Sequence, residues 1–347
     1  MKRFIIHKKD LHLISDRNYK NAVDMMGSDA IITNTDNLDY HNLDFVAICL
    51  TPAEELAFKN AGVEITESKP QPAIIGKWNG ASVFQPTLGK YPFEEMGFDK
   101  YDNKNITGKN IKVGAIDSGF NPSGTCTINS GINYTSGDSS YADVVGHGTH
   151  VSYMCKSAVW GTIPNSNFRM IKCITDIGMM DETLFLAGVS DAIANQLQLV
   201  NMSFQLSGTR SVIQSAIDSL ISAGCLPIVA GGNSGNAADV SMPASCFGTV
   251  AVGYCGPNFI IDPSSSLQVP SGGHGITIVA PGQNVPVGGD AGTGLGNGSS
   301  YAAPYVMAAL ACIMQEHNMN PFQALNLLKG NAIKSNSLYG AGFLNCP

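Results

Sequence analysis

The sequence predicts an α/β fold: a mostly parallel central sheet with helices on both faces, preceded by a small α+β domain. From residue 111 onward, apolar strand-like runs alternate with helical patterns, as is typical of parallel sheets. The first 70 residues instead follow a β-α-β-β-α-β order, that of the ferredoxin-like split motif. The segment Lys69-Pro70-Gln71-Pro72 indicates a linker. We therefore expect a small domain at 1–75, a linker and N-terminal segment at 76–104, and a main domain at 105–347.

In the small domain, the second helix carries the clearest signals. Thr51 is a suitable N-cap, Pro52 suits the first helical position, and Gly62 suits the residue after the end. The expected strands are 3–8, 30–33, 45–50 and 63–66, and the expected helices are 18–26 and 51–60.

The main domain is expected to begin its alternation with a strand that ends near Asp117. The expected strands are 111–116, 168–174, 199–203, 227–230, 249–252 and 277–279. The expected helices are 147–157, 181–195, 210–223 and 300–317.

Composition restricts the function classes. Twenty Lys and Arg against 27 Asp and Glu give a net charge of −7, and no basic stripe occurs, which disfavours a nucleic-acid partner. No apolar run reaches the roughly 18 residues that a membrane span needs, and charges interrupt the first ten residues before a signal-peptide core forms. The nine cysteines are scattered and odd in number, which favours reduced, buried thiols over a metal site or a disulfide framework. We expect a cytoplasmic, intracellular protein without membrane association, with a non-standard export route as the open alternative.

Three short segments supply the parts of an acyl-transfer site. Residues 111–119 carry Asp117, residues 146–151 carry His147, and residues 298–304 carry Ser300. Serine is a weak nucleophile unless a base takes its proton, a histidine can serve as that base, and a carboxylate can fix the tautomer of the histidine. Taken alone, the Asp-Ser-Gly segment would indicate a turn, and the segment around Ser300 would indicate a loop. The three segments together predict Asp117, His147 and Ser300 as catalytic residues.

A zinc site is the alternative for the histidine segment, because His150 follows His147 by three residues. No glutamate follows in the H-E-x-x-H manner, and the spacing offers no third ligand. We therefore predict no metal ligands there and interpret His150 as a packed neighbour of His147.

The order Asp, His, Ser is that of subtilisin, and the chain resembles the subtilisin-like serine proteases (subtilases). The resemblance has strong motifs over about 105–345 and weak ones over 1–70. It implies that the small domain is a propeptide that assists folding and then acts as an inhibitor in cis. A propeptide cut would fall between residues 68 and 88.

The resemblance also implies the rest of the site. The segment 228–235 resembles the oxyanion-hole segment, so the Asn233 amide and the Ser300 backbone N–H are expected to stabilise the oxyanion. An Asn that merely favours turn geometry is the alternative. Substrate is expected to bind in an extended form at a sheet edge. The substrate-binding residues that we expect are Ser203, Phe204, Gln205, Gly231, Gly232, Ser241 and Asn297.

Several positions depart from the family pattern. Gln205 and Leu206 stand where glycines are usual, which should reshape the substrate subsites. Ser299 replaces a threonine and Tyr301 a methionine beside Ser300. The calcium-binding insertion usual after the histidine helix is short here and offers only two asparagines, so no cofactor is expected to be required, although calcium elsewhere stays open. The segments expected around the scissile bond carry no acidic residue, which favours an uncharged substrate residue before it.

These features predict a serine endopeptidase that hydrolyses polypeptide substrates through an acyl-enzyme and is made as a self-processing zymogen. The alternatives are a pseudoprotease or permanently inhibited binding protein on the same fold, and an esterase or transacylase that uses the same residues.

Overall fold

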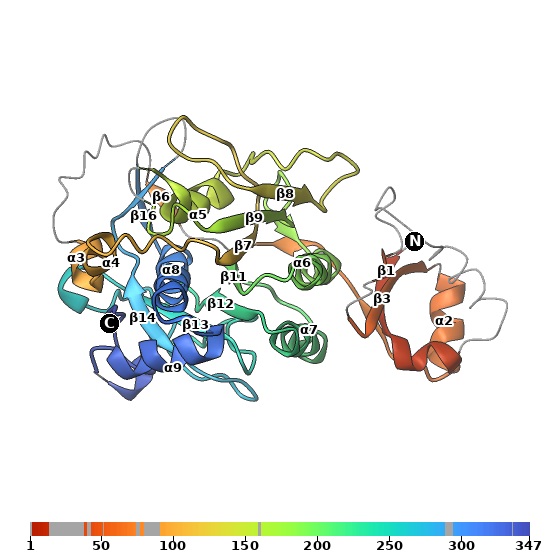
Figure 1. Cartoon of the computed structure of the whole chain (residues 1–347). Helices are drawn as coiled ribbons and strands as arrows, with labels where there is room; N and C mark the ends of the chain where they lie inside the picture. Colours follow the sequence, from red (N-terminus) through yellow and green to blue (C-terminus); the bar gives the residue numbers. More distant parts are fainter. Residues whose placement is uncertain are drawn as a thin grey trace.

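The computed structural model describes residues 2–13, 38–39, 43–50, 52–73, 77–79, 91–158, 161–288, 294–334 and 336–347. Its centre is a seven-stranded sheet with the order β14-β13-β12-β11-β7-β9-β8, in which every neighbouring pair is parallel (Figure 1). The strands are β7 Lys112–Asp117, β8 Ser130–Asn133, β9 Asn167–Lys172, β11 Leu199–Met202, β12 Leu226–Ala230, β13 Val250–Cys255 and β14 Ile278–Pro281. The predicted α/β fold class is confirmed.

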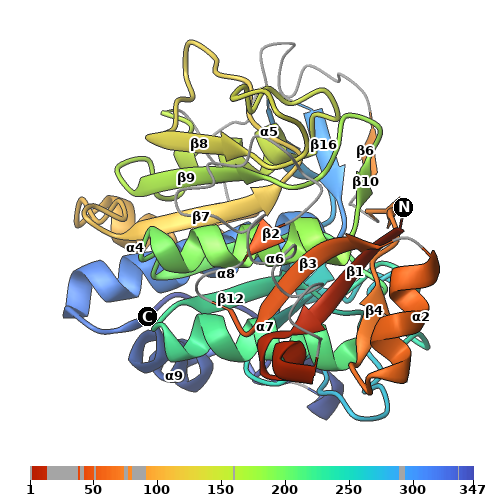
Figure 2. The same ribbon diagram turned by 90° about the vertical axis from the view of Figure 1, so that its right-hand side faces the viewer.

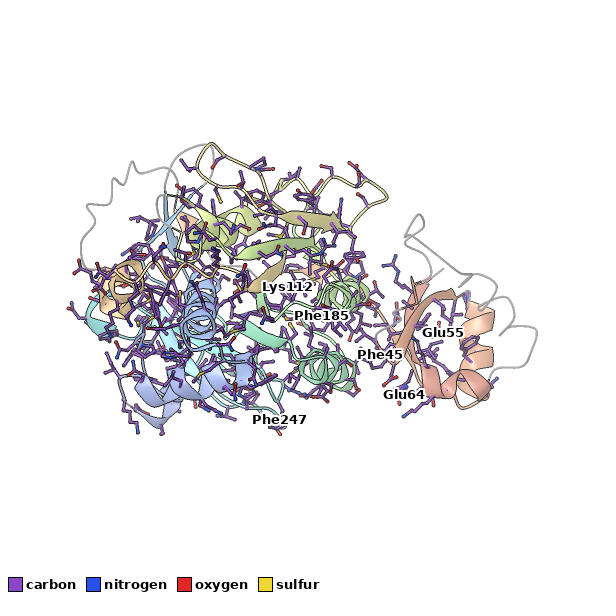
Figure 3. The ribbon with its side chains drawn as sticks, viewed as in Figure 1. Phe45, Glu55, Glu64, Lys112, Phe185 and Phe247 are labelled. Carbon is purple, nitrogen blue, oxygen red and sulfur yellow. The ribbon has the colours of Figure 1, made fainter. Side chains whose placement is uncertain are left out.

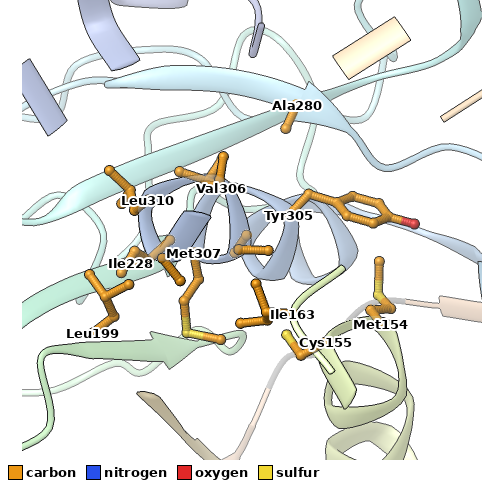
Figure 4. Packing of buried hydrophobic residues seen from close by; sticks show 14 of the residues in the cluster. Met154, Cys155, Ile163, Leu199, Ile228, Ala280, Tyr305, Val306, Met307 and Leu310 are labelled. Carbon is orange, nitrogen blue, oxygen red and sulfur yellow. The ribbon is translucent and has the colours of Figure 1, made fainter. Parts of the chain in front are cut away.

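Helices cover both faces of this sheet. One face is packed against α5 and α8, and the other against α6 and α7. Figure 4 shows the apolar side chains around α8, where Met307 and Tyr305 lie among residues from the strands and from α5. The main helices are α5 His147–Lys156, α6 Glu182–Ala194, α7 Arg210–Ser222, α8 Ser299–His317 and α9 Pro321–Asn331.

Strand β7 is the point from which the chain winds in both directions. It pairs with β9 on one side and with β11 on the other. At such a switch point the carboxyl ends of the strands diverge, and ligand sites form beside them. Asp117, the last residue of β7, therefore stands at the position where a parallel sheet most readily builds a site.

The first part of the chain forms a separate four-stranded antiparallel sheet with the order β2-β3-β1-β4. Its elements are β1 Lys2–His7, a 3₁₀ turn Lys8–Leu13, β2 Leu38–Asp39, β3 Phe45–Leu50, α2 Pro52–Asn60 and β4 Ile65–Glu67. We call the described residues up to Ser68 the N-terminal unit. The expected helix at 18–26 and strand at 30–33 lie outside the described residues.

The N-terminal unit buries both faces of its sheet. Phe4 and Ile6 pack beneath α2, whereas Ile5 and Phe45 belong to the same apolar cluster as α6 and α7 of the main domain. This follows from the two-residue period of strands, which turns alternate side chains to opposite faces. Figure 2 shows the sheet lying across α6 and α7, and Figure 3 shows Phe45 on the face turned toward them.

Polar contacts join the same two bodies at the start of α6. The Arg3 guanidinium donates to Thr183 Oγ1 at 2.8 Å and lies 3.4 Å from the Asp181 carboxylate. The Thr183 N–H in turn donates to Ser68 Oγ at 3.3 Å. Asp181 is also the N-cap of α6 and accepts from the Leu184 N–H. The N-terminal unit therefore docks on a helix start that is already stabilised by a residue of the main domain.

Candidate active site

Asp117 and His147 form a buried, hydrogen-bonded pair. The carboxylate Oδ1 lies 2.8 Å from His147 Nδ1, and both side chains are almost fully buried. Gly148 permits the close approach, because a Cβ there would lie 2.3 Å from the Gly119 carbonyl oxygen and 3.2 Å from Asp117 Cβ. This pairing leaves His147 Nε2 as the nitrogen that can act as a base.

The start of α5 is fixed by a carboxylate cap. Asp143 accepts from the Gly146 N–H at 2.7 Å and from the Thr149 N–H at 2.8 Å. Gly146 has φ 88°, a left-handed conformation that suits glycine at the turn into His147. The backbone that carries the imidazole is therefore held by hydrogen bonds independent of Asp117.

Ser300 lies in the first turn of α8 and is bound to the end of β11. Its Oγ donates to the Ser203 carbonyl at 2.9 Å, and Ser203 Oγ donates back to the Ser300 carbonyl at 2.7 Å. His147 Nε2 is buried and has no hydrogen-bond partner within the described part of the chain. The acceptor of the Ser300 hydroxyl is therefore a backbone carbonyl.

Tyr301 joins the two halves of the site. Its ring centroid lies 5.8 Å from that of His147, and its hydroxyl lies 3.5 Å from His150 Nδ1. Burial, followed by the neighbouring His147, lowers the pKa of His150 to about 4, so His150 is neutral at pH 7. Within the described residues, no group of three or more His, Cys, Asp or Glu side chains gathers as a metal site would require.

Asn233 is tied to the same helix start. Its Oδ1 accepts from the Ser299 N–H at 2.8 Å and from Ser299 Oγ at 3.0 Å. The Gly232 N–H donates to Ser299 Oγ at 3.1 Å. Because the side-chain oxygen of Asn233 is engaged, its NH₂ group is the end left to face an acceptor.

The expected substrate-binding residues fall into different environments. Gln205 Nε2 lies where a Cβ on Gly232 would meet it at 2.7 Å, so the segments that follow β11 and β12 face each other. Ser241 Oγ donates to the Gly231 carbonyl at 3.2 Å. Phe204, however, is fully buried and packs edge-on against Phe185 of α6, with ring centroids 6.5 Å apart. Its side chain is therefore part of the core, and only its backbone can face a substrate.

Two short strands of the linker pair with strands of the main domain. β5 Gln71–Pro72 is antiparallel to β10 Met179–Met180, and the Ala73 N–H donates to the Gly178 carbonyl at 2.8 Å. β6 Lys77–Asn79 is antiparallel to β16 Gly294–Asn297, which also pairs with β15 Val285–Val287. Asn297 lies opposite Lys77 in this pairing, and its Oδ1 accepts from the Asn284 N–H at 2.9 Å.

The sequence reasoning missed the partners of these linker strands. β10 is only two residues long, and β16 contains Gly294 and Gly296, so neither offers an apolar period. The only available signal for β10 was the Asp181 N-cap, which places a short connecting segment before α6.

The cysteine side chains that the structure describes are buried and form no disulfide. Burial raises the pKa of Cys126 to about 12 and that of Cys246 to about 11, so these thiols are inert at neutral pH. In the described ranges, no helix combines the length and the apolar character needed to cross a bilayer.

Comparison with known proteins gives consistent matches over the main domain. A sequence model described as "Subtilase family" matches residues 108–342. The chain is 31% identical over 252 residues to an alkaline protease of Alkalihalobacillus alcalophilus, covering 70% of this chain and 65% of that protein. It is 30% identical over 252 residues to Subtilisin Savinase of Lederbergia lenta, covering 70% and 91% respectively. A crystal structure of a cold adapted subtilisin-like serine proteinase aligns with a TM-score of 0.61 and 25% identity, covering 70% of this chain and 91% of that one.

Proposed function

The chain belongs to the subtilase family of serine proteases, and on that premise we propose that it is a serine endopeptidase with Asp117, His147 and Ser300 as its catalytic residues. The observation that carries the proposal is the buried Asp117–His147 pair, whose Nε2 has no partner among the described residues. An unpaired buried nitrogen is costly unless another group uses it. A rotation of Ser300 Oγ away from the Ser203 carbonyl would supply the missing donor.

The proposed chemical steps use these three side chains in turn. His147 Nε2 takes the proton of Ser300 as Oγ attacks the peptide carbonyl, and it later donates that proton to the leaving amine. Asp117 holds Nδ1–H and stabilises the imidazolium that forms. The Asn233 NH₂ and the Ser300 backbone N–H are the donors proposed for the oxyanion. Hydrolysis of the resulting acyl-enzyme by water repeats the same proton transfers.

We also propose that the N-terminal unit is a propeptide and that the chain cleaves itself. Two features support this: the linker strands β5 and β6 pair with β10 and β16, and the N-terminal unit docks on α6 and α7. An extended chain paired with a sheet edge has the backbone arrangement of a bound peptide substrate. The bond to be cut would then lie between Ala73 and Lys77.

Mass spectrometry of the purified protein beside Ser300→Ala tests both proposals. The wild type is expected to lose a fragment that ends between residues 73 and 76, whereas Ser300→Ala stays intact because it lacks the nucleophile. Cleavage of Ser300→Ala at the same bond would point to another protease. An intact wild type that still reacts with a fluorophosphonate would contradict self-processing but not the proposed catalytic residues.

A permanently inhibited protein is the second candidate. The observations that favour it are the donation from Ser300 Oγ to the Ser203 carbonyl and the pairing of the linker strands β5 and β6 with β10 and β16. Fluorophosphonate labelling separates the two candidates, because only a serine activated by its base reacts. A folded wild-type chain that labels only after removal of its first 76 residues would support the inhibited protein, whereas one that stays unlabelled would indicate a pseudoprotease.

No metal cofactor is proposed. In the segment after α5, the Asn165 NH₂ group donates to Thr107 Oγ1 at 2.9 Å, so its side chain offers a single amide oxygen, whereas calcium takes about six to eight oxygen ligands. A melting temperature unchanged by a chelator would support this proposal, and a fall restored by calcium would contradict it.

A further inference from the structure

The side chain of Gln71 makes a specific contact outside the proposed catalytic residues. Gln71 pairs with Met180 through the backbone, and its Nε2 donates to the carbonyl of Ser207. Ser207 belongs to the loop 205–209, which follows β11 and begins at Gln205. The contact therefore joins a side chain of the bound strand to the backbone of the main domain.

The Ser207 carbonyl is held in position from both sides. The preceding residue, Leu206, donates its N–H to the Met242 carbonyl at 2.9 Å. The Thr209 N–H donates to Glu182 Oε1 at 2.5 Å. Gly208 fits only because it lacks a side chain, since a Cβ there would lie 2.6 Å from Glu182 Oε1. The acceptor is thus preorganised before any peptide arrives.

Glu182 is the residue that fixes this loop. It is the first residue of α6, it is 3% exposed, and burial raises the pKa of its carboxyl group. A carboxylate buried at a helix N-terminus is favoured by the helix dipole and by the Thr209 N–H. Replacing it would release the loop that carries the Ser207 carbonyl.

We propose that the loop 205–209 selects polypeptide substrates that carry a glutamine-like amide donor at the position of Gln71, with Glu182 as a positioning residue. The inference rests on the proposed endopeptidase function and names its substrate class. A backbone carbonyl only accepts hydrogen bonds. A glutamine at the position of Gln71 donates to the Ser207 carbonyl, whereas a methionine of similar length leaves this carbonyl unpaired. A glutamate places a second oxygen against the carbonyl, with the Glu182 carboxylate nearby.

Three peptides test the selection. Each copies residues 68–79, with Gln, Met or Glu at position 71, and is digested by the full chain after self-processing, with active sites counted by fluorophosphonate titration. We expect kcat/KM for the Gln peptide to exceed that for the Met peptide roughly threefold to tenfold, and that for the Glu peptide by at least about tenfold. Equal values, a faster Met peptide, or no cleavage of any peptide by a labelled enzyme would overturn the inference. A chain that does not label would instead overturn the proposed function, and the inference with it.

Variants of Glu182 test the positioning role. Glu182→Leu should reduce the Gln-to-Met ratio toward one, because the loop loses its anchor at Thr209. Glu182→Gln keeps an acceptor oxygen and should keep the Gln-to-Met ratio, while improving the Glu peptide through loss of the charge. An equal loss for all three peptides would indicate a structural role only and would overturn the positioning role. If Glu182→Leu does not fold, Gly208→Ala displaces the same loop and should reduce the same ratio.

Discussion

The two halves of the candidate active site are held differently. On one side, the Asp117 carboxylate and the His147 imidazole are buried and joined at 2.8 Å, and Asp143 holds the start of the helix that carries His147. On the other side, Ser300 is held by Ser203 through two reciprocal bonds, one of which uses the hydroxyl itself. The difference teaches that the fold fixes the Asp117–His147 pair, whereas in the proposed mechanism the Ser300 hydroxyl must leave the Ser203 carbonyl before it attacks.

The largest loss of kcat should come from a change in the Asp117–His147 pair. Asp117→Asn preserves the size of the side chain but reverses the polarity of the bond to His147 Nδ1, so the imidazole takes the wrong tautomer. We expect kcat to fall roughly ten-thousandfold, as measured on a chromogenic peptide at pH 7. A fall below tenfold would mean that the pair does not fix the base.

Asn233→Ala tests the donor proposed beside the nucleophile. It removes the NH₂ group, together with the two hydrogen bonds that Oδ1 accepts from Ser299, and kcat should fall roughly 100- to 1000-fold with little change in KM. Fluorophosphonate labelling of the same sample is the control for a competent nucleophile. A change confined to KM would assign Asn233 to ground-state binding instead.

His150→Gln tests how the buried histidine beside the Asp117–His147 pair affects the pH dependence of stability. Burial holds the pKa of His150 at about 4, below the 6.5 of an exposed histidine. The unfolded chain therefore binds more protons between these values, and the stability contributed by neutral His150 is present above about pH 6.5 and is lost as the pH falls toward 4. Between pH 7 and pH 4.5, the free energy of unfolding of the variant should fall by about 1–3 kcal/mol less than that of the wild type. Urea unfolding at the two pH values measures both falls. If the free energy of unfolding fell equally with pH in the wild type and the variant, this expectation would be wrong.

Ser203→Ala should give the smallest effect. It removes the bond from Ser203 Oγ to the Ser300 carbonyl but keeps the carbonyl that accepts from Ser300 Oγ. We expect a loss of about 1 kcal/mol in the free energy of unfolding and a change in kcat of less than about tenfold. A loss as large as that of Asp117→Asn would show that both halves are fixed to the same degree.

Much of the main domain was predictable because its strands are buried and apolar. β7, β11 and β12 read directly as such runs, and the motifs around Asp117 and His147 are local in sequence. β8 was not predicted, since its residues are all half-buried and supply no apolar run. Strong local signals identify elements, whereas edge strands depend on neighbours that the sequence does not reveal.

The sequence suggested candidate site residues but not the orientations of their side chains. Phe204 was expected at the substrate, yet its side chain lies against Phe185, because strand period alone does not say which face is the core. The donation from Ser300 to Ser203 was not foreseeable either. A hydroxyl rotates freely between acceptors, and only the packed structure shows which acceptor it takes.

The N-terminal unit is covalently joined to the surface that it covers, and this has a consequence for dilution. A tethered partner acts at an effective concentration in the millimolar range, whatever the amount of protein in solution. If the proposed cut between Ala73 and Lys77 is made, the same interface becomes an ordinary bimolecular association. Occupancy of the surface would then fall as the two pieces are diluted, so that one broken bond would convert a constant occupancy into a concentration-dependent one.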